Sequence, residues 1–91
     1  MEGLTEGRIV HYVLPDGEHR PAIVVKVWRY KNAANSDELI VPENGCSNLQ
    51  VFMDSDAEAK WNDKMLPVSW RTSVTYSENQ DPGTWHWIEK A

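Results

Sequence analysis

The chain has 91 residues, of which 41% are hydrophobic and 25% are charged. This length leaves no room for a second independent core, so residues 1–91 are expected to form a single domain. Nine Lys and Arg against fourteen Asp and Glu give a net charge of −5. That balance argues against a general nucleic-acid coat, because such proteins need a basic surface.

Cysteine content and hydropathy favour the cytoplasm. Cys46 is the single cysteine, so no disulfide can form within the chain, as is typical of reducing compartments. No apolar run reaches the length of a membrane span, and the first residues lack the basic and apolar regions of a signal peptide. We therefore expect a cytoplasmic protein with no membrane partner.

The first third of the sequence predicts a β-hairpin. Residues 8–14 (RIVHYVL) and 21–30 (PAIVVKVWRY) are rich in β-branched and aromatic side chains, which favour strands. Between them, Pro15 presets φ and Gly17 tolerates a positive φ, as a tight turn requires. Pro21 fits only at the start or edge of its strand, because proline cannot donate a ladder hydrogen bond.

The middle of the chain predicts a loop, a short edge strand and a third main strand. Residues 31–38 are polar, residues 39–41 are briefly apolar, and Asn44-Gly45 is a turn signal. Residues 48–53 (NLQVFM) alternate as a half-buried strand does. Its two faces are Leu49, Val51 and Met53 on one side and Gln50 and Phe52 on the other.

A short helix is expected next. Ser55 followed three residues later by Glu58 is the capping-box pattern of a helix start, and Pro67 ends the helix. The apolar stripe of this helix consists of Ala57, Trp61 and Met65.

Two more strands follow, at residues 68–76 (VSWRTSVTY) and 84–88 (TWHWI). Trp85 and Trp87 lie on the face opposite His86 and Ile88, and the apolar area of the indole rings favours the core for the two tryptophans. In the strand at 68–76, the alternation places Val68, Trp70, Thr72, Val74 and Tyr76 on one face.

These elements predict a mainly β domain, a small five-stranded antiparallel SH3-like barrel with one short helix inserted before strand four. Five short, strongly bent strands close most readily into such a barrel, which limits exposed edges. An SH3-like barrel is favoured over an OB-like one, because the first two strands form a long hairpin and no long helix is available. The last strand of such a barrel pairs near the first, which explains the aromatic residues at 85–87.

No residue pattern matches a catalytic or metal-binding motif. His11, His19 and His86 are the only histidines and are scattered in the sequence, whereas zinc ligands usually occur in close groups. Cys46 lacks the surroundings of known catalytic cysteines, and no phosphate-binding glycine motif is present. The sequence therefore predicts no enzyme, no metal and no cofactor, although convergence of the histidines in the fold stays open.

A group of aromatic and basic residues indicates ligand binding. If Ile23, Val25, Val27 and Arg29 face the core, the residues between them line an outer face with Lys26, Trp28 and Tyr30. Flat rings beside a cation suit a base, a nucleotide or a proline-rich peptide, and arginine suits phosphates. The alternative is that Trp28 packs under the long loop, with the stem of Lys26 covering it. The candidate ligand-binding residues are Arg8, His11, Arg20, Lys26, Trp28, Arg29, Tyr30, Trp85 and Trp87.

Three segments carry a family resemblance: GRIVHYVLPDGEHRPAIVV (7–25), SNLQVF (47–52) and GTWHW (83–87). Together with residues 72–76, they resemble a family of small uncharacterised proteins encoded by bacteriophages and prophages. The resemblance implies a phage origin and action in the cytoplasm of the bacterial host. Because the family is uncharacterised, it implies no activity and no catalytic residue.

We therefore expect a non-enzymatic phage accessory protein that binds and neutralises a host component, either a defence protein or a small anionic nucleotide signal. Five Trp exceed what one small core accommodates, which favours an exposed interface and a homo-oligomer. One alternative is a nucleic-acid-associated SH3-like module, which the basic first half supports and the net charge disfavours. Others are a structural protein of the virion and an enzyme that uses the three histidines as acid–base groups.

Overall fold

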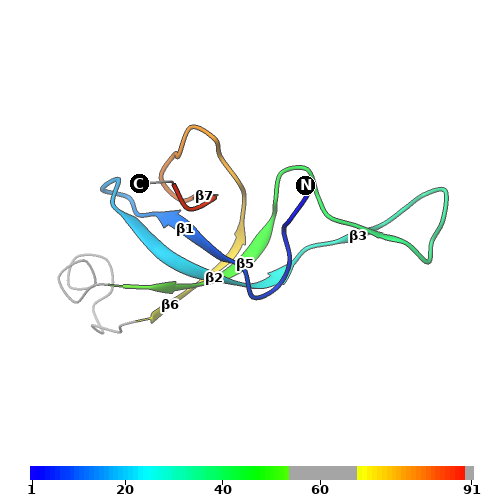
Figure 1. Ribbon diagram of the computed structural model, residues 1–91, viewed down its shortest axis with the longest axis horizontal. Coiled ribbons are helices and arrows are strands. Elements are labelled where there is room, and N and C mark those ends of the chain that lie inside the picture. The colour runs from blue at the N-terminus through cyan, green and yellow to red at the C-terminus, as the bar shows by residue number, and fades with distance from the viewer. Residues whose placement is uncertain (54–67, 90–91) are drawn as a thin grey trace.

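The computed structural model describes residues 1–53 and 68–89, which form an all-β domain. Five strands make one antiparallel sheet in the order β6-β5-β2-β1-β7, and two short strands make a separate hairpin (Figure 1). The strands are β1 (Ile9–Val13), β2 (His19–Val27), β3 (Tyr30–Lys31), β4 (Leu39–Ile40), β5 (Ser47–Phe52), β6 (Val68–Val74) and β7 (Trp85–His86).

The hairpin of β1 and β2 is confirmed. Val13 pairs with His19 at its closed end, and the N–H of Leu14 donates to the carbonyl of Glu18 over 2.8 Å. Gly17 in the turn has a φ of +90°, a conformation that side chains disfavour and glycine adopts freely. The turn residues therefore fix the register of these two strands.

A bulge in β2 changes which of its residues face the core. The register of β2 against β5 shifts between Val24 and Lys26, because a bulge adds one residue to one strand of the pair. Val24 and Val27 are both buried as a result, whereas Val25 is 43% exposed. The prediction that Ile23, Val25 and Val27 share the core face is therefore wrong.

The strand β5 follows the predicted alternation, and β6 does not. Phe52 in β5 is exposed between the buried Val51 and Met53, as expected from the period of two. In β6, Trp70 is exposed whereas Val74 is buried. The residue before Val74, Ser73, has a φ of +52°, so the strand leaves regular extended geometry there. The predicted common face along 68–76 is wrong for this reason.

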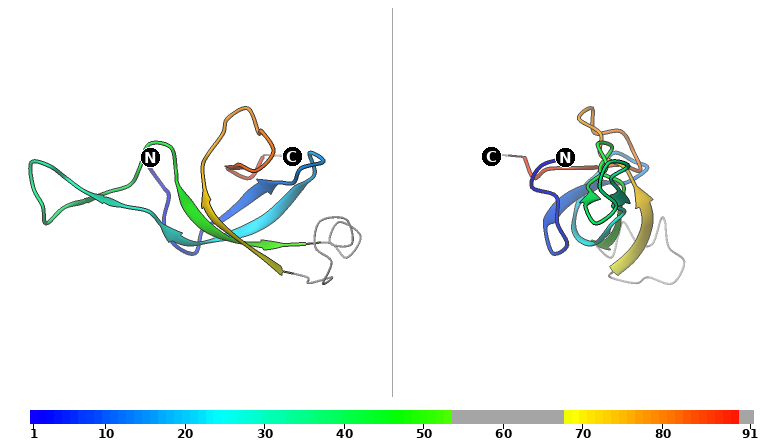
Figure 2. Two further views of the ribbon diagram at one scale, coloured as in Figure 1. Left: turned by 180° about the vertical axis from the view of Figure 1, so that it is seen from behind. Right: turned by 90° about the vertical axis from the view of Figure 1, so that its right-hand side faces the viewer.

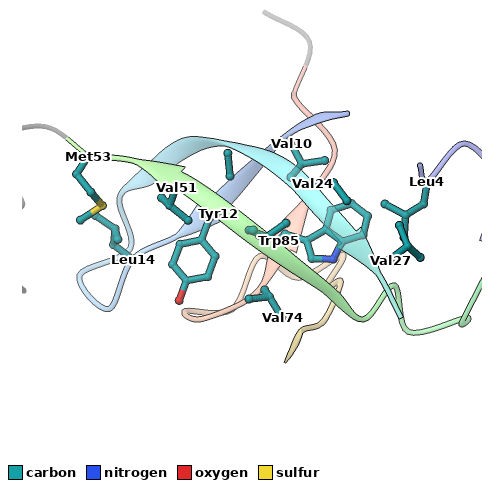
Figure 3. Close-up of a cluster of buried hydrophobic side chains, with 12 residues drawn as sticks. Leu4, Val10, Tyr12, Leu14, Val24, Val27, Val51, Met53, Val74 and Trp85 are labelled. Atoms are coloured by element: carbon teal, nitrogen blue, oxygen red, sulfur yellow. The ribbon is translucent and has the colours of Figure 1, made fainter. Parts of the chain in front are cut away.

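The core lies along the inner side of the bent sheet and contains a completely buried Trp85 (Figure 3). The indole N–H of Trp85 donates to the carbonyl of Gly45 over 2.9 Å. Its ring packs edge-to-face against Tyr76 and Trp87, with centroids 5.1 and 5.0 Å apart. Trp85 in β7 and Trp87 just after it thus both face the core, as predicted. The core cluster comprises Leu4, Val10, Tyr12, Leu14, Ala22, Val24, Val27, Leu49, Val51, Met53, Val74 and Trp85.

The sheet is strongly bent (Figure 2) but does not close into a barrel within residues 1–53 and 68–89. The last strand β7 pairs antiparallel with β1, which confirms that the chain returns to its first strand. Beyond β6, the chain meets the opposite edge of the sheet through a parallel bridge between Tyr76 and Trp85 and through packing of their rings. The all-β class and the five-stranded antiparallel sheet are confirmed, without barrel closure. The helix predicted between Ser55 and Pro67 lies outside the described residues.

Residues 30–40 form an arm that extends from the body along the longest axis of the molecule (Figures 1 and 2). Within the arm β3 and β4 pair antiparallel, and the N–H of Asn32 donates to the carbonyl of Glu38 over 3.0 Å. The domain measures 48 × 28 × 18 Å, with a radius of gyration of 14.2 Å. The predicted loop and edge strand are therefore parts of one separate hairpin. In the described part of the chain, no helix is long and apolar enough to cross a membrane.

Candidate metal centre

Three histidines from three different strands converge on one carboxylate. His11 belongs to β1, His19 to β2 and His86 to β7, and Glu89 follows β7 by three residues. Each histidine offers one ring nitrogen and Glu89 offers one oxygen, and these four atoms all lie within 4.8 Å of one another. The structure thus brings together side chains that the sequence leaves up to 78 positions apart.

Strand alternation and pairing explain this convergence. Tyr12 and Trp85 face the core, so their chain neighbours His11 and His86 project to the opposite face of the sheet. These two histidines are direct partners in the β1–β7 ladder. In β2, His19 lies two residues from the ladder partner of His11, and it therefore projects to the same side.

The carboxylate of Glu89 contacts all three imidazoles. Nδ1 of His11 lies 2.6 Å from Oε2, Nδ1 of His19 lies 2.7 Å from Oε1, and Nε2 of His86 also contacts Oε1. The centroids of the three imidazole rings are 4.6 to 6.3 Å apart. The side chains of His11, His19 and Glu89 are 24%, 31% and 37% exposed, whereas that of His86 is 4% exposed. The cluster therefore has a buried base and an open outer side.

Glu89 is an anion throughout the ordinary pH range. Partial burial raises the pKa of Glu89, but a hydrogen bond from its own backbone N–H and those from the three imidazoles outweigh burial and lower the pKa to about 2. A neutral imidazole that carries its proton on the other nitrogen presents a lone pair at the same place. The four side chains can therefore offer three nitrogen ligands and one oxygen ligand to a cation.

This ligand set matches the preferences of a divalent first-row transition metal. Imidazole nitrogen suits Zn²⁺, Cu²⁺, Fe²⁺ and Ni²⁺, and a carboxylate is a common companion ligand. Tetrahedral zinc with bonds of about 2.0–2.1 Å holds its ligand atoms about 3.4 Å apart. A separation of 4.8 Å must then shorten by roughly 1.4 Å. Rotation of the partly exposed side chains of His19 and Glu89 can supply that movement.

One outer contact of the cluster is missing. Nδ1 of His86 is buried and has no hydrogen-bond partner in the part of the chain that the structure describes. A metal-bound histidine usually donates its second N–H to a carbonyl or carboxylate, and loss of such a partner typically weakens metal affinity by about 10- to 100-fold. We therefore expect weaker binding than at a site with complete outer hydrogen bonding.

The predicted aromatic site is present in part. Nζ of Lys26 lies 3.9 Å from the centroid of the Trp28 ring, and both side chains are exposed. The indole N–H of Trp28 donates to Oδ1 of Asn48 over 2.9 Å, which fixes the ring on the sheet. Tyr30 is exposed at the base of the arm. Trp85, in contrast, is buried and offers no surface to a ligand.

The three predicted arginines do not converge on a common anion site. Arg29 forms a two-pronged ion pair with Glu6, with N–O distances of 2.7 and 2.8 Å. Arg20 donates from Nε to a backbone carbonyl of β5 over 3.0 Å. The guanidinium carbon of Arg8 lies 5.2 Å from the centroid of the Trp87 ring. Each arginine is therefore engaged with a different part of the fold.

Of the residues predicted to bind a ligand, the histidine cluster includes His11 alone. The prediction omits His19, although the hairpin register places it on the same face as His11, and it omits His86 and Glu89, whose positions depend on the exact register of β7 against β1. We found no match to the chain among protein-family models, curated proteins or solved structures. The function must therefore be argued from the chemistry of the cluster itself.

Proposed function

We propose that this protein binds a divalent transition-metal ion, of which Zn²⁺ is the reference, through His11, His19, His86 and Glu89. The observation that carries the proposal is the meeting of four ligand atoms within 4.8 Å, three of them from histidines on strands held in place by backbone hydrogen bonding. Three neutral imidazoles and one carboxylate leave a dication with one net positive charge, a favourable balance in a site that is partly exposed to water.

An ion at this centre would connect β1, β2 and β7. β7 has two residues and joins the sheet through two residue pairs with β1, so the ion would add a cross-link where the ladder is shortest. A ligand that binds only the folded state stabilises it by about 2.7 kcal/mol at a concentration of 100 times Kd. We therefore expect the metal to raise Tm by about 10 °C or more at this concentration, given the size of the domain.

The proposal is tested by titrating chelator-treated protein with Zn²⁺ in a calorimeter. The expected result is one ion per chain. Substituting the partly exposed ligands, His11→Ala or His19→Ala, should weaken binding by more than the 10- to 100-fold that outer contacts typically contribute. Circular dichroism without metal checks that each variant keeps the fold.

Glu78→Gln provides a matched control, because Glu78 is an exposed carboxylate outside the cluster. This variant should bind Zn²⁺ as the wild type does. A triple variant, His11→Ala/His19→Ala/His86→Ala, removes all the imidazoles of the cluster. If the wild-type protein binds no more Zn²⁺ than this triple variant, the cluster is a hydrogen-bonded group without a metal function, and the proposal is wrong.

A second candidate function is binding of a host component by a phage accessory protein, either a defence protein or a small anionic nucleotide. The exposed pair of Lys26 and Trp28 supports this candidate, because a cation stacked on an indole suits a base or a peptide. This second proposal also includes an SH3-like barrel as the fold and assembly of the chain into a homo-oligomer. Trp28→Ala should then abolish binding of the host component while leaving Zn²⁺ binding unchanged.

A further inference from the structure

The four ligands of the proposed metal centre are not held equally. His11, His19 and His86 lie within strands, where the ladder fixes each backbone position. Glu89 lies beyond the end of β7 and belongs to no strand. Outside the strands, no backbone–backbone hydrogen bond among the described residues involves residues 87–89. The sheet thus holds the backbone of the three histidines, whereas Glu89 is attached to a segment that the ladder does not hold.

Exposure follows the same division. The side chain of Glu89 is the most exposed of the four and that of His86 the least. Ile88, next to Glu89, is also exposed, so the core does not anchor the chain at this point. The last firm anchor is Trp87, which packs against Trp85. Glu89 can therefore leave the cluster without displacing the backbone of the three histidines, which the strands hold in place.

We propose that the three imidazoles form a permanent tripod for the ion and that Glu89 is an exchangeable fourth ligand, which an external anionic oxygen can replace. This inference rests on the proposed metal binding. Closed zinc sites use four fixed protein ligands, whereas sites that accept substrate or water keep one coordination position available. Here the position is covered by a tethered carboxylate rather than left to water.

The charges define the class of external ligand. Three neutral imidazoles leave a dication with both of its positive charges, and Glu89 cancels one of them. A ligand that replaces Glu89 keeps this balance if it also brings a negatively charged oxygen, as a carboxylate or a phosphate does. Since the described residues form no pocket, the site would recognise the anionic group and make few contacts with the rest of the ligand. We infer a small carboxylate or phosphate anion.

Competition between the carboxylate of Glu89 and an external anion for the ion predicts the effect of removing this carboxylate. A ligand tethered by a short flexible segment acts at an effective concentration in the millimolar range. An external anion must displace it, which weakens the apparent affinity for that anion. Glu89→Gln retains the size of the side chain and removes its charge, so external anions should bind this variant about tenfold more tightly or better.

The test uses the Co²⁺-loaded protein, because Co²⁺ takes zinc-like sites and its visible absorption reports its ligands. Wild type and Glu89→Gln are each titrated with sodium acetate and, separately, with inorganic phosphate. The expected result is a saturable spectral change in both proteins, at lower anion concentration in Glu89→Gln. Co²⁺ affinity should fall by about the same tenfold in Glu89→Gln, because the carboxylate that competes with the anion also ligates the ion, and by more than about 100-fold in His86→Ala or in His19→Ala. The response to acetate or to phosphate shows which anion the site prefers.

Two outcomes would overturn the inference while leaving metal binding intact. One is a wild-type Co²⁺ spectrum that neither anion changes, as in a closed structural site. The other is loss of Co²⁺ from Glu89→Gln as complete as from His19→Ala, which would make Glu89 an indispensable ligand. Failure of the wild type to bind Co²⁺ or Zn²⁺ at all would instead refute the proposed function.

Discussion

Gly45 occupies a backbone position beside the largest buried side chain of the domain. Its φ is +66°, and a Cβ at this residue would lie 2.7 Å from Cζ2 of Trp85 and 3.0 Å from Cβ of Tyr76. The carbonyl of Gly45 also accepts the indole N–H of Trp85. One residue thus supplies a left-handed turn, space for the ring and its hydrogen-bond acceptor.

Gly45→Ala should therefore destabilise the domain by about 2–5 kcal/mol, the sum of left-handed strain and overpacking. The measurement is urea unfolding followed by tryptophan fluorescence. Gly83→Ala is the control, because Gly83 also has a positive φ, +82°, but no atom lies within 4 Å of its added Cβ. Equal losses in the two variants would show that the contact with Trp85 contributes nothing.

The residues of the metal centre could be predicted only in part from the sequence. The tight turn at Pro15–Glu18 fixes the register of β1 and β2, and this register alone places His11 and His19 on one face. The position of His86 depends instead on β7, whose register is set by the packing of Trp85 in the core. That packing joins distant segments, and no local pattern of the sequence reports it.

Among the elements, β2 shows why strand alternation is an incomplete guide. The run AIVVKV at residues 22–27 is apolar at nearly every position, so it fits either face without a polarity conflict. The bulge between Val24 and Lys26 then decides which side chains are buried. Strand existence and pairing could be predicted, because β-branched content and turn residues are local signals. The sequence does not predict which side chains face the core beyond the bulge, because a bulge has no comparable local signal.

The bulge predicts that truncating two adjacent valines changes the stability of the domain by very different amounts. Val24→Ala should cost about 2 kcal/mol of folding free energy, because it removes buried methyl groups and leaves a cavity. Val25→Ala should change stability by no more than about 0.5 kcal/mol, since its side chain is exposed. Chemical denaturation of both variants measures the difference. A larger loss in Val25→Ala than in Val24→Ala would restore the simple alternation and contradict the bulge.

For the whole molecule, two carboxylates link stability to acid pH. The hydrogen bond from Arg29, together with one from the N–H of Val27, lowers the pKa of Glu6 to about 2. The pKa of Glu89 is also lowered to about 2, because the hydrogen bonds from its own N–H and from the imidazoles outweigh burial, which alone would raise it. Both values lie below the ordinary 4.5, so the unfolded chain binds more protons between these limits.

Stability of the metal-free protein should therefore fall as the pH drops from about 4.5 towards 2. Both side chains are more than a third exposed, so solvent screening reduces the size of the effect. In the double variant Glu6→Gln/Glu89→Gln, stability should depend less steeply on pH over this window. Urea midpoints measured across the window in the presence of a chelator test this. Parallel curves for variant and wild type would refute the linkage.

The arm has a consequence for how the protein behaves in solution. A compact chain of this length has an expected radius of gyration of roughly 12 Å, and the observed value is 14.2 Å. The excess slows diffusion, so a monomer should elute from a sizing column ahead of a sphere of equal mass. Early elution would therefore indicate the elongated shape of a monomer and would not by itself demonstrate association. Sedimentation equilibrium or light scattering, which report mass independently of shape, is the appropriate way to count chains.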